Sequence, residues 1–175
     1  MRTGQEVIWR GEPDSGYMGL MDKLKTAVNT VSGGSARVSI EYPSHSVYPG
    51  EPLAVRVTVM SSGGEVKSNG IFVDLLGVET VSGSDKVTCP RCKNQWSDPI
   101  NKRNEVVKQS IPLSPAFVLN GAETRVFEGQ IQIPGGSPPS YSGTAARFEW
   151  TIRGRLEAFG NDPDSGYQSV RVGAK

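Results

Sequence analysis

Residues 138–143 read PPSYSG and residues 146–158 read ARFEWTIRGRLEA, so a turn-forming segment leads into one long run of alternating side chains. Successive side chains point to opposite faces of a strand, which places Phe148, Trp150 and Ile152 on one face and arginines on the other. A strand with one apolar and one charged face is typical of an antiparallel sheet and not of a parallel one. The run therefore predicts a sheet that buries only one of its faces.

The same alternating pattern recurs along most of the chain. Its 21 glycines and 12 prolines among 175 residues fall in turn-like clusters between the apolar segments, as in proteins made of many short strands. Seven or more strands favour an all-β, antiparallel two-sheet sandwich, and an up-and-down barrel stays open on the pattern alone. We predict strands over residues 36–42, 53–59, 70–79, 106–111, 124–133, 146–158 and 167–172.

The length of 175 residues suits one well-buried domain and is short for two. We expect an N-terminal extension over residues 1–17, a short amphipathic helix with a glycine linker over residues 18–34, and the sandwich over residues 35–175. The helix is indicated by apolar residues at one-face spacing, and the glycines that follow them would end it. Those apolar residues are Leu20, Met21, Leu24, Ala27, Val28 and Val31.

Two roles are open for this predicted helix. It can pack against the sandwich or a neighbouring subunit, or it can lie on a membrane surface through Leu20, Leu24 and Val28. Because Lys23 and Lys25 are its only basic residues, the electrostatic part of any membrane contact would be weak.

A balanced charge, together with a sequence in which we find no targeting signal, predicts a cytoplasmic protein. Nineteen basic side chains stand against eighteen acidic ones, so no overall field favours nucleic acid or an anionic membrane, and we expect no nucleic-acid partner. The longest apolar stretches have the length of strands, which predicts no transmembrane helix, and the first residues lack the apolar core of a signal peptide. Two cysteines three positions apart are not the disulfide framework of a small secreted domain.

The sharpest local motif is CPRCKNQW over residues 89–96. Cys89 and Cys92 can chelate one zinc ion, because two intervening residues bring both sulfurs within reach of a tetrahedral metal. They make half a site, since the only histidine, His45, lies several predicted strands away. A complete set would need the cysteines of a second chain or an oxygen ligand such as Asp98. A plain reduced pair and a disulfide or redox pair are the alternatives, and zinc is the only cofactor that the sequence indicates.

The segment around these cysteines, residues 86–108, is predicted to be a basic loop. It holds six basic side chains against two acidic ones and can meet phosphate, nucleic acid or a protein surface, although a solvated loop is the plainer interpretation. The candidate partner-binding residues are Arg91, Lys93, Trp96, Lys102 and Arg103.

No set of residues points to catalysis. His45 would be the only histidine base for a serine triad, and no Gly-x-Ser-x-Gly motif precedes a helix. The glycine-rich stretches lack the Lys-Ser/Thr ending that cradles phosphate. Asp162 and Asp164 lie in a turn between proline and glycine, where a solvated or weakly cation-binding loop is expected. The sequence therefore predicts a protein that is not an enzyme.

Several turn-and-strand motifs together resemble those of the arrestin-like clan over roughly residues 18–172. Within the clan, the start MGLMDKLK at residues 18–25 is similar to the bacterial sporulation-control protein family. The motifs that carry the resemblance are YPGE (48–51), GIFVDLLG (70–77), IP (133–134), PPSYSG (138–143) and FEWTIRGRL (148–156).

The resemblance implies an immunoglobulin-like sandwich of the arrestin N-domain type. It also implies a non-catalytic adaptor or scaffold that binds a protein partner, in sporulation or stress-type regulation in a bacterium. The partner would bind an exposed sheet edge or the basic loop. The alternative is a structural subunit of a homo-oligomeric assembly, joined by the N-terminal helix and the loop of Cys89 and Cys92.

Overall fold

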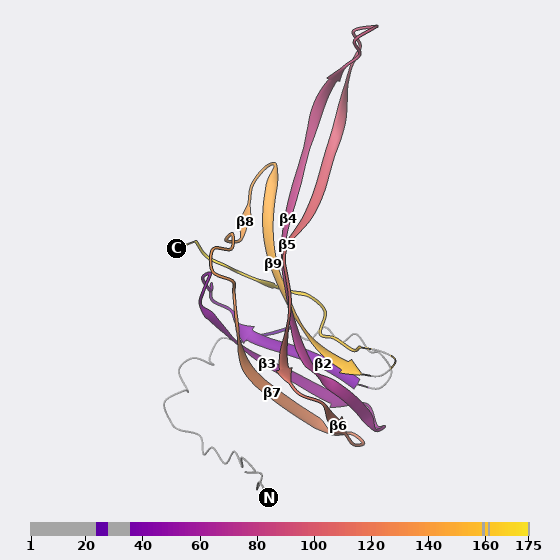
Figure 1. Cartoon of the computed structure of the whole chain (residues 1–175), viewed down its shortest axis with the longest axis vertical. Coiled ribbons are helices and arrows are strands. Elements are labelled where there is room, and N and C mark those ends of the chain that lie inside the picture. The colour runs from indigo at the N-terminus through magenta and orange to yellow at the C-terminus, as the bar shows by residue number, and fades with distance from the viewer. Residues whose placement is uncertain (1–23, 28–35, 159, 161, 175) are drawn as a thin grey trace, which may run out of the picture.

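The computed structural model describes residues 24–27, 36–158, 160 and 162–174, and its regular elements are strands in two antiparallel sheets (Figure 1). The first sheet has the order β1-β2-β3-β7, with β1 (Leu24–Ala27), β2 (Ala36–Pro43), β3 (Pro52–Ser61) and β7 (Thr124–Gln132). The second has the order β10-β9-β4-β5, with β10 (Gln168–Val170), β9 (Ala146–Ala158), β4 (Val66–Thr88) and β5 (Gln95–Ser114). Two short strands extend it, since β6 (Phe117–Leu119) pairs with β4 and β8 (Tyr141–Ser142) pairs with β9.

The core lies between the two sheets and is made by alternate side chains of their strands. In β9, Phe148, Trp150 and Ile152 are each at most 2% exposed, as the alternation in the sequence predicts. The indole N–H of Trp150 donates to the carbonyl of Pro138 at 2.9 Å, so its one polar atom is satisfied inside the core. Two facing sheets around one core confirm the predicted all-β sandwich and decide against the barrel.

Gly154 marks a close approach between the two sheets. A Cβ atom at this position would lie 3.0 and 3.1 Å from the two methyl groups of Val57 on β3. Contacts this short leave no room for a side chain, which explains why glycine occupies an inward-facing position of β9.

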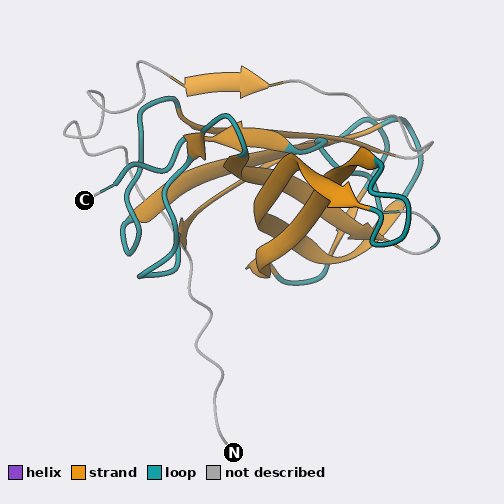
Figure 2. Ribbon diagram, turned by 90° about the horizontal axis from the view of Figure 1, so that it is seen from above, coloured by secondary structure: helices purple, strands orange, loops and turns teal. Residues whose placement is uncertain are grey.

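The predicted N-terminal helix is wrong where the structure describes its residues. Leu24–Ala27 form β1, which pairs antiparallel with β2, and no described residue is helical (Figure 2). Without β1, the backbone groups at this edge of β2 would have no strand beside them, and such an edge favours the addition of a strand. A two-faced pattern of four residues cannot distinguish a strand from one turn of a helix.

The other predictions for the N-terminal segment concern residues outside the described part of the chain. They are the extension over residues 1–17, the remainder of the segment 18–34, and the membrane-contact residues Leu20 and Val28. Leu24, the third such residue, lies in β1. Among the residues that the structure describes, there is no helix long and apolar enough to cross a membrane.

The basic loop predicted over residues 86–108 is also wrong, because most of this segment is strand. β4 continues to Thr88, a turn spans residues 89–94, and β5 begins at Gln95. Both faces of this part of the hairpin are exposed to solvent. A strand exposed on both faces needs no apolar alternation, so its sequence resembles that of a loop.

Candidate functional site

A long two-stranded ribbon projects from the sandwich and carries the predicted site residues (Figure 1). β9 runs beside β4 only as far as the pair Val81 and Ala146, whereas β4 and β5 stay paired out to Thr88 and Gln95. Beyond the end of β9 the hairpin has no third named strand beside it among the described residues. We call residues 81–103 the ribbon.

One face of the ribbon carries its exposed apolar side chains. Directly opposed residues of an antiparallel pair lie on the same face, so the pair Val87–Trp96 shares a face with Ile100 and Val81. Trp96 is 51% exposed and Ile100 is 37% exposed. We call this surface the ribbon apolar face; Asp85, Asp98 and Lys102 lie on it as well.

The five candidate partner-binding residues all lie on the ribbon but do not form one patch. Trp96 and Lys102 lie on the ribbon apolar face, whereas Arg103, opposite Thr80, lies on the other face and pairs with Glu105 at 3.1 Å. The remaining two, Arg91 and Lys93, lie in the turn at the tip. The five residues therefore lie on three separate surfaces: the ribbon apolar face, the opposite face of the ribbon and the turn at the tip.

The turn at the tip holds both cysteines in a defined conformation. The amide of Lys93 donates to the carbonyl of Cys89 at 3.0 Å, and the amide of Cys89 donates to the carbonyl of Asn94 at 2.8 Å. Lys93 has a φ of 60°, the left-handed region that non-glycine residues seldom occupy. The backbone N–H of Cys92 also points at the Sγ atom of Cys89, at 3.4 Å.

These contacts favour the thiolate of Cys89. The backbone N–H of Cys92, followed by the Cys92 thiol and the backbone N–H groups of Arg91 and Lys93, lowers the pKa of Cys89 against a smaller opposing effect of desolvation. The described residues contain no cluster of three or more histidine, cysteine, aspartate or glutamate side chains able to hold a metal ion.

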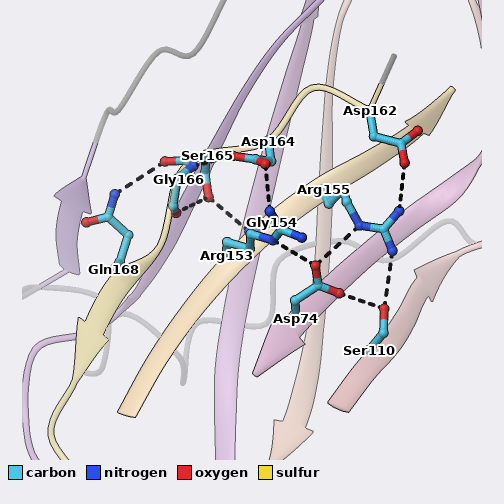
Figure 3. Close-up of polar contacts among 10 residues, drawn as sticks. All are labelled: Asp74, Ser110, Arg153, Gly154, Arg155, Asp162, Asp164, Ser165, Gly166 and Gln168. Carbon is cyan, nitrogen blue, oxygen red and sulfur yellow. Dashed lines mark hydrogen bonds and ion pairs between the residues drawn. The ribbon is translucent and has the colours of Figure 1, made fainter. Parts of the chain in front are cut away.

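A second polar feature, which the sequence did not indicate, lies on the outer face of the second sheet (Figure 3). Asp74 on β4 accepts hydrogen bonds from Ser110 at 2.6 Å and from the Nε of Arg153 at 2.8 Å, and Arg155 lies 3.3 Å from the same carboxylate. We call Asp74, Ser110, Arg153, Arg155, Asp162 and Asp164 the polar cluster.

The turn of Asp162 and Asp164 is part of this cluster: Asp162 is exposed, as expected for a solvated loop, but both carboxylates pair with arginines of β9. Asp164 pairs with Arg153 at 2.9 Å, and Asp162 pairs with Arg155 at 3.3 Å. The ring of Tyr167 lies over the guanidinium of Arg153, 4.7 Å from its centroid. These two carboxylates reach the arginines because the chain turns back after β9, where Asp164 forms an isolated antiparallel bridge with Arg155.

The contacts of Asp74 make the stability of the fold depend on pH. Burial alone would raise the pKa of Asp74, but the hydrogen bonds from Ser110 and Arg153 and the charges of Arg155 and Arg153 outweigh burial and lower it. A carboxylate whose pKa is lower in the folded state stabilises the fold above its unfolded pKa, and this contribution is lost as the pH falls through the folded value.

We therefore expect the free energy of unfolding to fall with acidification below about pH 4, the region of an unfolded aspartate. Replacing Asp74 by asparagine should make this decline shallower, because asparagine does not titrate. Urea unfolding at a series of pH values measures both slopes. Equal slopes for the wild type and Asp74→Asn would contradict this account of the cluster.

Comparison with known proteins identifies the fold. No protein-family model matches the chain, and no curated protein matches it in sequence. In structure, the chain is similar to Spo0M, a sporulation control protein from Bacillus subtilis, with a TM-score of 0.57 and 17% sequence identity. The match covers 81% of this chain and 51% of the other, so this chain spans about half the length of that protein. The likeness shows that the two proteins share a sandwich fold.

Proposed function

We propose that the protein is a non-catalytic, arrestin-like adaptor that binds a protein partner through the ribbon apolar face. The observation that carries this proposal is the exposed tryptophan, Trp96, on a strand pair that projects from the sandwich and has no core of its own. A two-stranded hairpin without a core of its own is only marginally stable in water. Exposed apolar side chains on such a hairpin are typical of a surface that binds a protein partner.

The open edge of the ribbon supports the same proposal. β5 is the last strand of its sheet, so its outward-facing backbone groups are available to an added strand of a partner. Trp96 and Ile100 on one face would then supply the apolar anchors, and Lys102 would supply charge complementarity.

The polar cluster supports a role without catalysis. Its carboxylates and guanidinium groups pair with one another, which is the pattern of a structural network.

His45, the only histidine, lines an open hollow of about 460 Å³, and Ser140 lines the same hollow. The Ser140 hydroxyl bonds backbone groups, accepting from the amide of Val172 at 3.0 Å.

The setting that we propose is a bacterial cytoplasm, with a role in sporulation or stress-type regulation. The likeness to the sporulation control protein Spo0M supports this setting. The balance of acidic and basic side chains fits a partner that is recognised locally and not by an overall field.

The proposal predicts that a ribbon variant loses its partner while the sandwich stays folded. Trp96→Ala combined with Ile100→Ser should weaken capture of the specific partner by at least about tenfold, the effect of removing an interface anchor worth roughly 1.4 kcal/mol or more. Quantitative affinity capture from the source cells, followed by mass spectrometry, measures the loss.

The matched control is Val126→Ser. Val126 is 53% exposed on β7 of the sandwich, so this variant also removes an exposed apolar side chain, but away from the ribbon. It should capture the partner as well as the wild type does. A partner that is lost with Val126→Ser and retained by the ribbon variant would place the interface on the sandwich and reject the proposal.

A further inference from the structure

The tip of the ribbon is built in a way that a simple hairpin connection does not require. Hydrogen bonding between the two strands continues to Cys89 and Asn94, which leaves residues 90–93 as a loop longer than the two-residue minimum, and Lys93 has a φ of 60°. A non-glycine residue in this region raises the energy of the backbone unless the surrounding contacts compensate. The conformation directs the backbone N–H of Cys92 toward the Sγ atom of Cys89, at 3.4 Å.

This arrangement suits a pair of metal-bound thiolates. Zinc binds cysteine as the thiolate, and backbone N–H groups aimed at the sulfur offset its negative charge. The two cysteines are separated by two residues of one turn, the spacing with which a pair of thiolates binds one zinc ion. Both cysteines are free and lie at the surface of the ribbon, where an ion can reach them.

Within the part of the chain that the structure describes, the turn supplies two of the four ligands that a structural zinc site uses. Cys89 and Cys92 are its only cysteines. The nearest carboxylates along the strands, Asp85 and Asp98, face each other across the ribbon, with the pair Val87–Trp96 between them and the turn. Asp85 is four residues from Cys89, which corresponds to roughly 13 Å of extended strand, whereas a zinc ligand lies about 2 Å from the ion.

We propose that this turn is half of a Cys₄ zinc site, completed by the same turn of a second copy of the chain. The tip lies at the far end of the ribbon from the sandwich (Figure 1), so two tips can meet without contact between the sandwiches. Such a dimer has two-fold symmetry, in which each copy contributes the same residues.

The charges of the tip fit this dimer. A zinc ion with four thiolates carries a net charge of −2, and Arg91 and Lys93 of the two copies bring four positive charges beside it. The zinc site uses residues of the tip, whereas the adaptor role uses the ribbon apolar face, so the two proposals rest on different residues. Loss of partner capture and loss of metal can therefore be measured separately.

The test uses the full chain, purified with a reducing agent and loaded with Zn²⁺ or with Co²⁺ as a spectroscopic substitute. Native mass spectrometry should show a dimer that holds one metal ion per two chains, and a chelator should release both the metal and the dimer. Bound Co²⁺ should give the visible absorption of a tetrahedral thiolate site.

The variant Cys89→Ser with Cys92→Ser should remain monomeric and metal-free with an unchanged far-UV circular dichroism spectrum. Ser84→Ala, an exposed substitution on the same ribbon, is the control and should dimerise as the wild type does. Three results would overturn the proposal: no metal bound at micromolar Zn²⁺, one metal ion per monomer, or a disulfide between the cysteines in protein that was thiol-blocked on extraction from the cell.

Discussion

Replacing Asp74 by alanine should lower the free energy of unfolding by about 3–5 kcal/mol, the usual loss when one partner of a buried ion pair is removed. Asp74 is 8% exposed and accepts hydrogen bonds from Ser110 and Arg153, with Arg155 also bound. Its removal leaves two guanidinium groups partly buried without their shared carboxylate. Urea unfolding followed by circular dichroism measures the loss at neutral pH.

Asp162→Ala is the matched control, because it removes a carboxylate from the same network. The Asp162 side chain is 45% exposed, pairs with Arg155 at 3.3 Å and accepts a hydrogen bond from the exposed backbone amide of Ala158 at 3.1 Å, so its loss should cost about 1 kcal/mol. Similar losses for Asp74→Ala and Asp162→Ala would mean that the network is an ordinary surface ion-pair cluster without a buried centre.

Trp150→Ala should produce an effect of comparable size in the core, about 3–5 kcal/mol. Trp150 is 1% exposed, contacts Phe148 with a ring-centroid distance of 5.6 Å, and donates its indole N–H to Pro138. Alanine at this position leaves a cavity between the two sheets and an unpaired carbonyl at Pro138. Thermal and urea unfolding both report the loss.

Trp96→Ala is the matched control, because it removes the same kind of side chain from an exposed position. Trp96 is 51% exposed on the ribbon and makes no contribution to the core cluster, so its removal should change the free energy of unfolding by about 0.5 kcal/mol or less. A large destabilisation by Trp96→Ala would show that the ribbon packs on the sandwich in solution, contrary to the structure.

The sequence was sufficient to predict the sandwich because one face of its strands is buried. The side chains of β9 alternate between a core that holds Phe148, Trp150 and Ile152 and an outer face of charged residues. Burial of one face imposes a period of two on the sequence, and this period is visible without any knowledge of the partner strands.

The same reasoning failed for the ribbon, where no face is buried. Lys86, Ser97 and Asn101 occupy strand positions as readily as they occupy loops once both faces meet solvent. The one available signal was the motif CPRCKN between two segments of similar length, which marks the turn of a hairpin. The sequence therefore predicted one loop where the structure has two strands and a turn.

The polar cluster could not be predicted because it depends on register between distant segments. Asp74 and Arg153 are 79 positions apart and become neighbours only because β4 and β9 pair with these residues opposite each other. The alternation of β9 placed its arginines on the outer face, but it gave no information about which carboxylates face them. Asp162 and Asp164 lie only 7 and 11 positions from Arg155 and Arg153, and their pairing depends on how the chain turns back after β9.

The central claim, that the ribbon is the surface that meets the partner, is tested most directly by site-specific photo-crosslinking in the source cells. A photoreactive phenylalanine analogue would replace Ile100 on the ribbon or Val126 on the sandwich, two exposed positions on different parts of the chain. If the ribbon meets the partner, position 100 should give a discrete crosslinked species and position 126 should give none. A partner crosslinked from position 126 alone would contradict it.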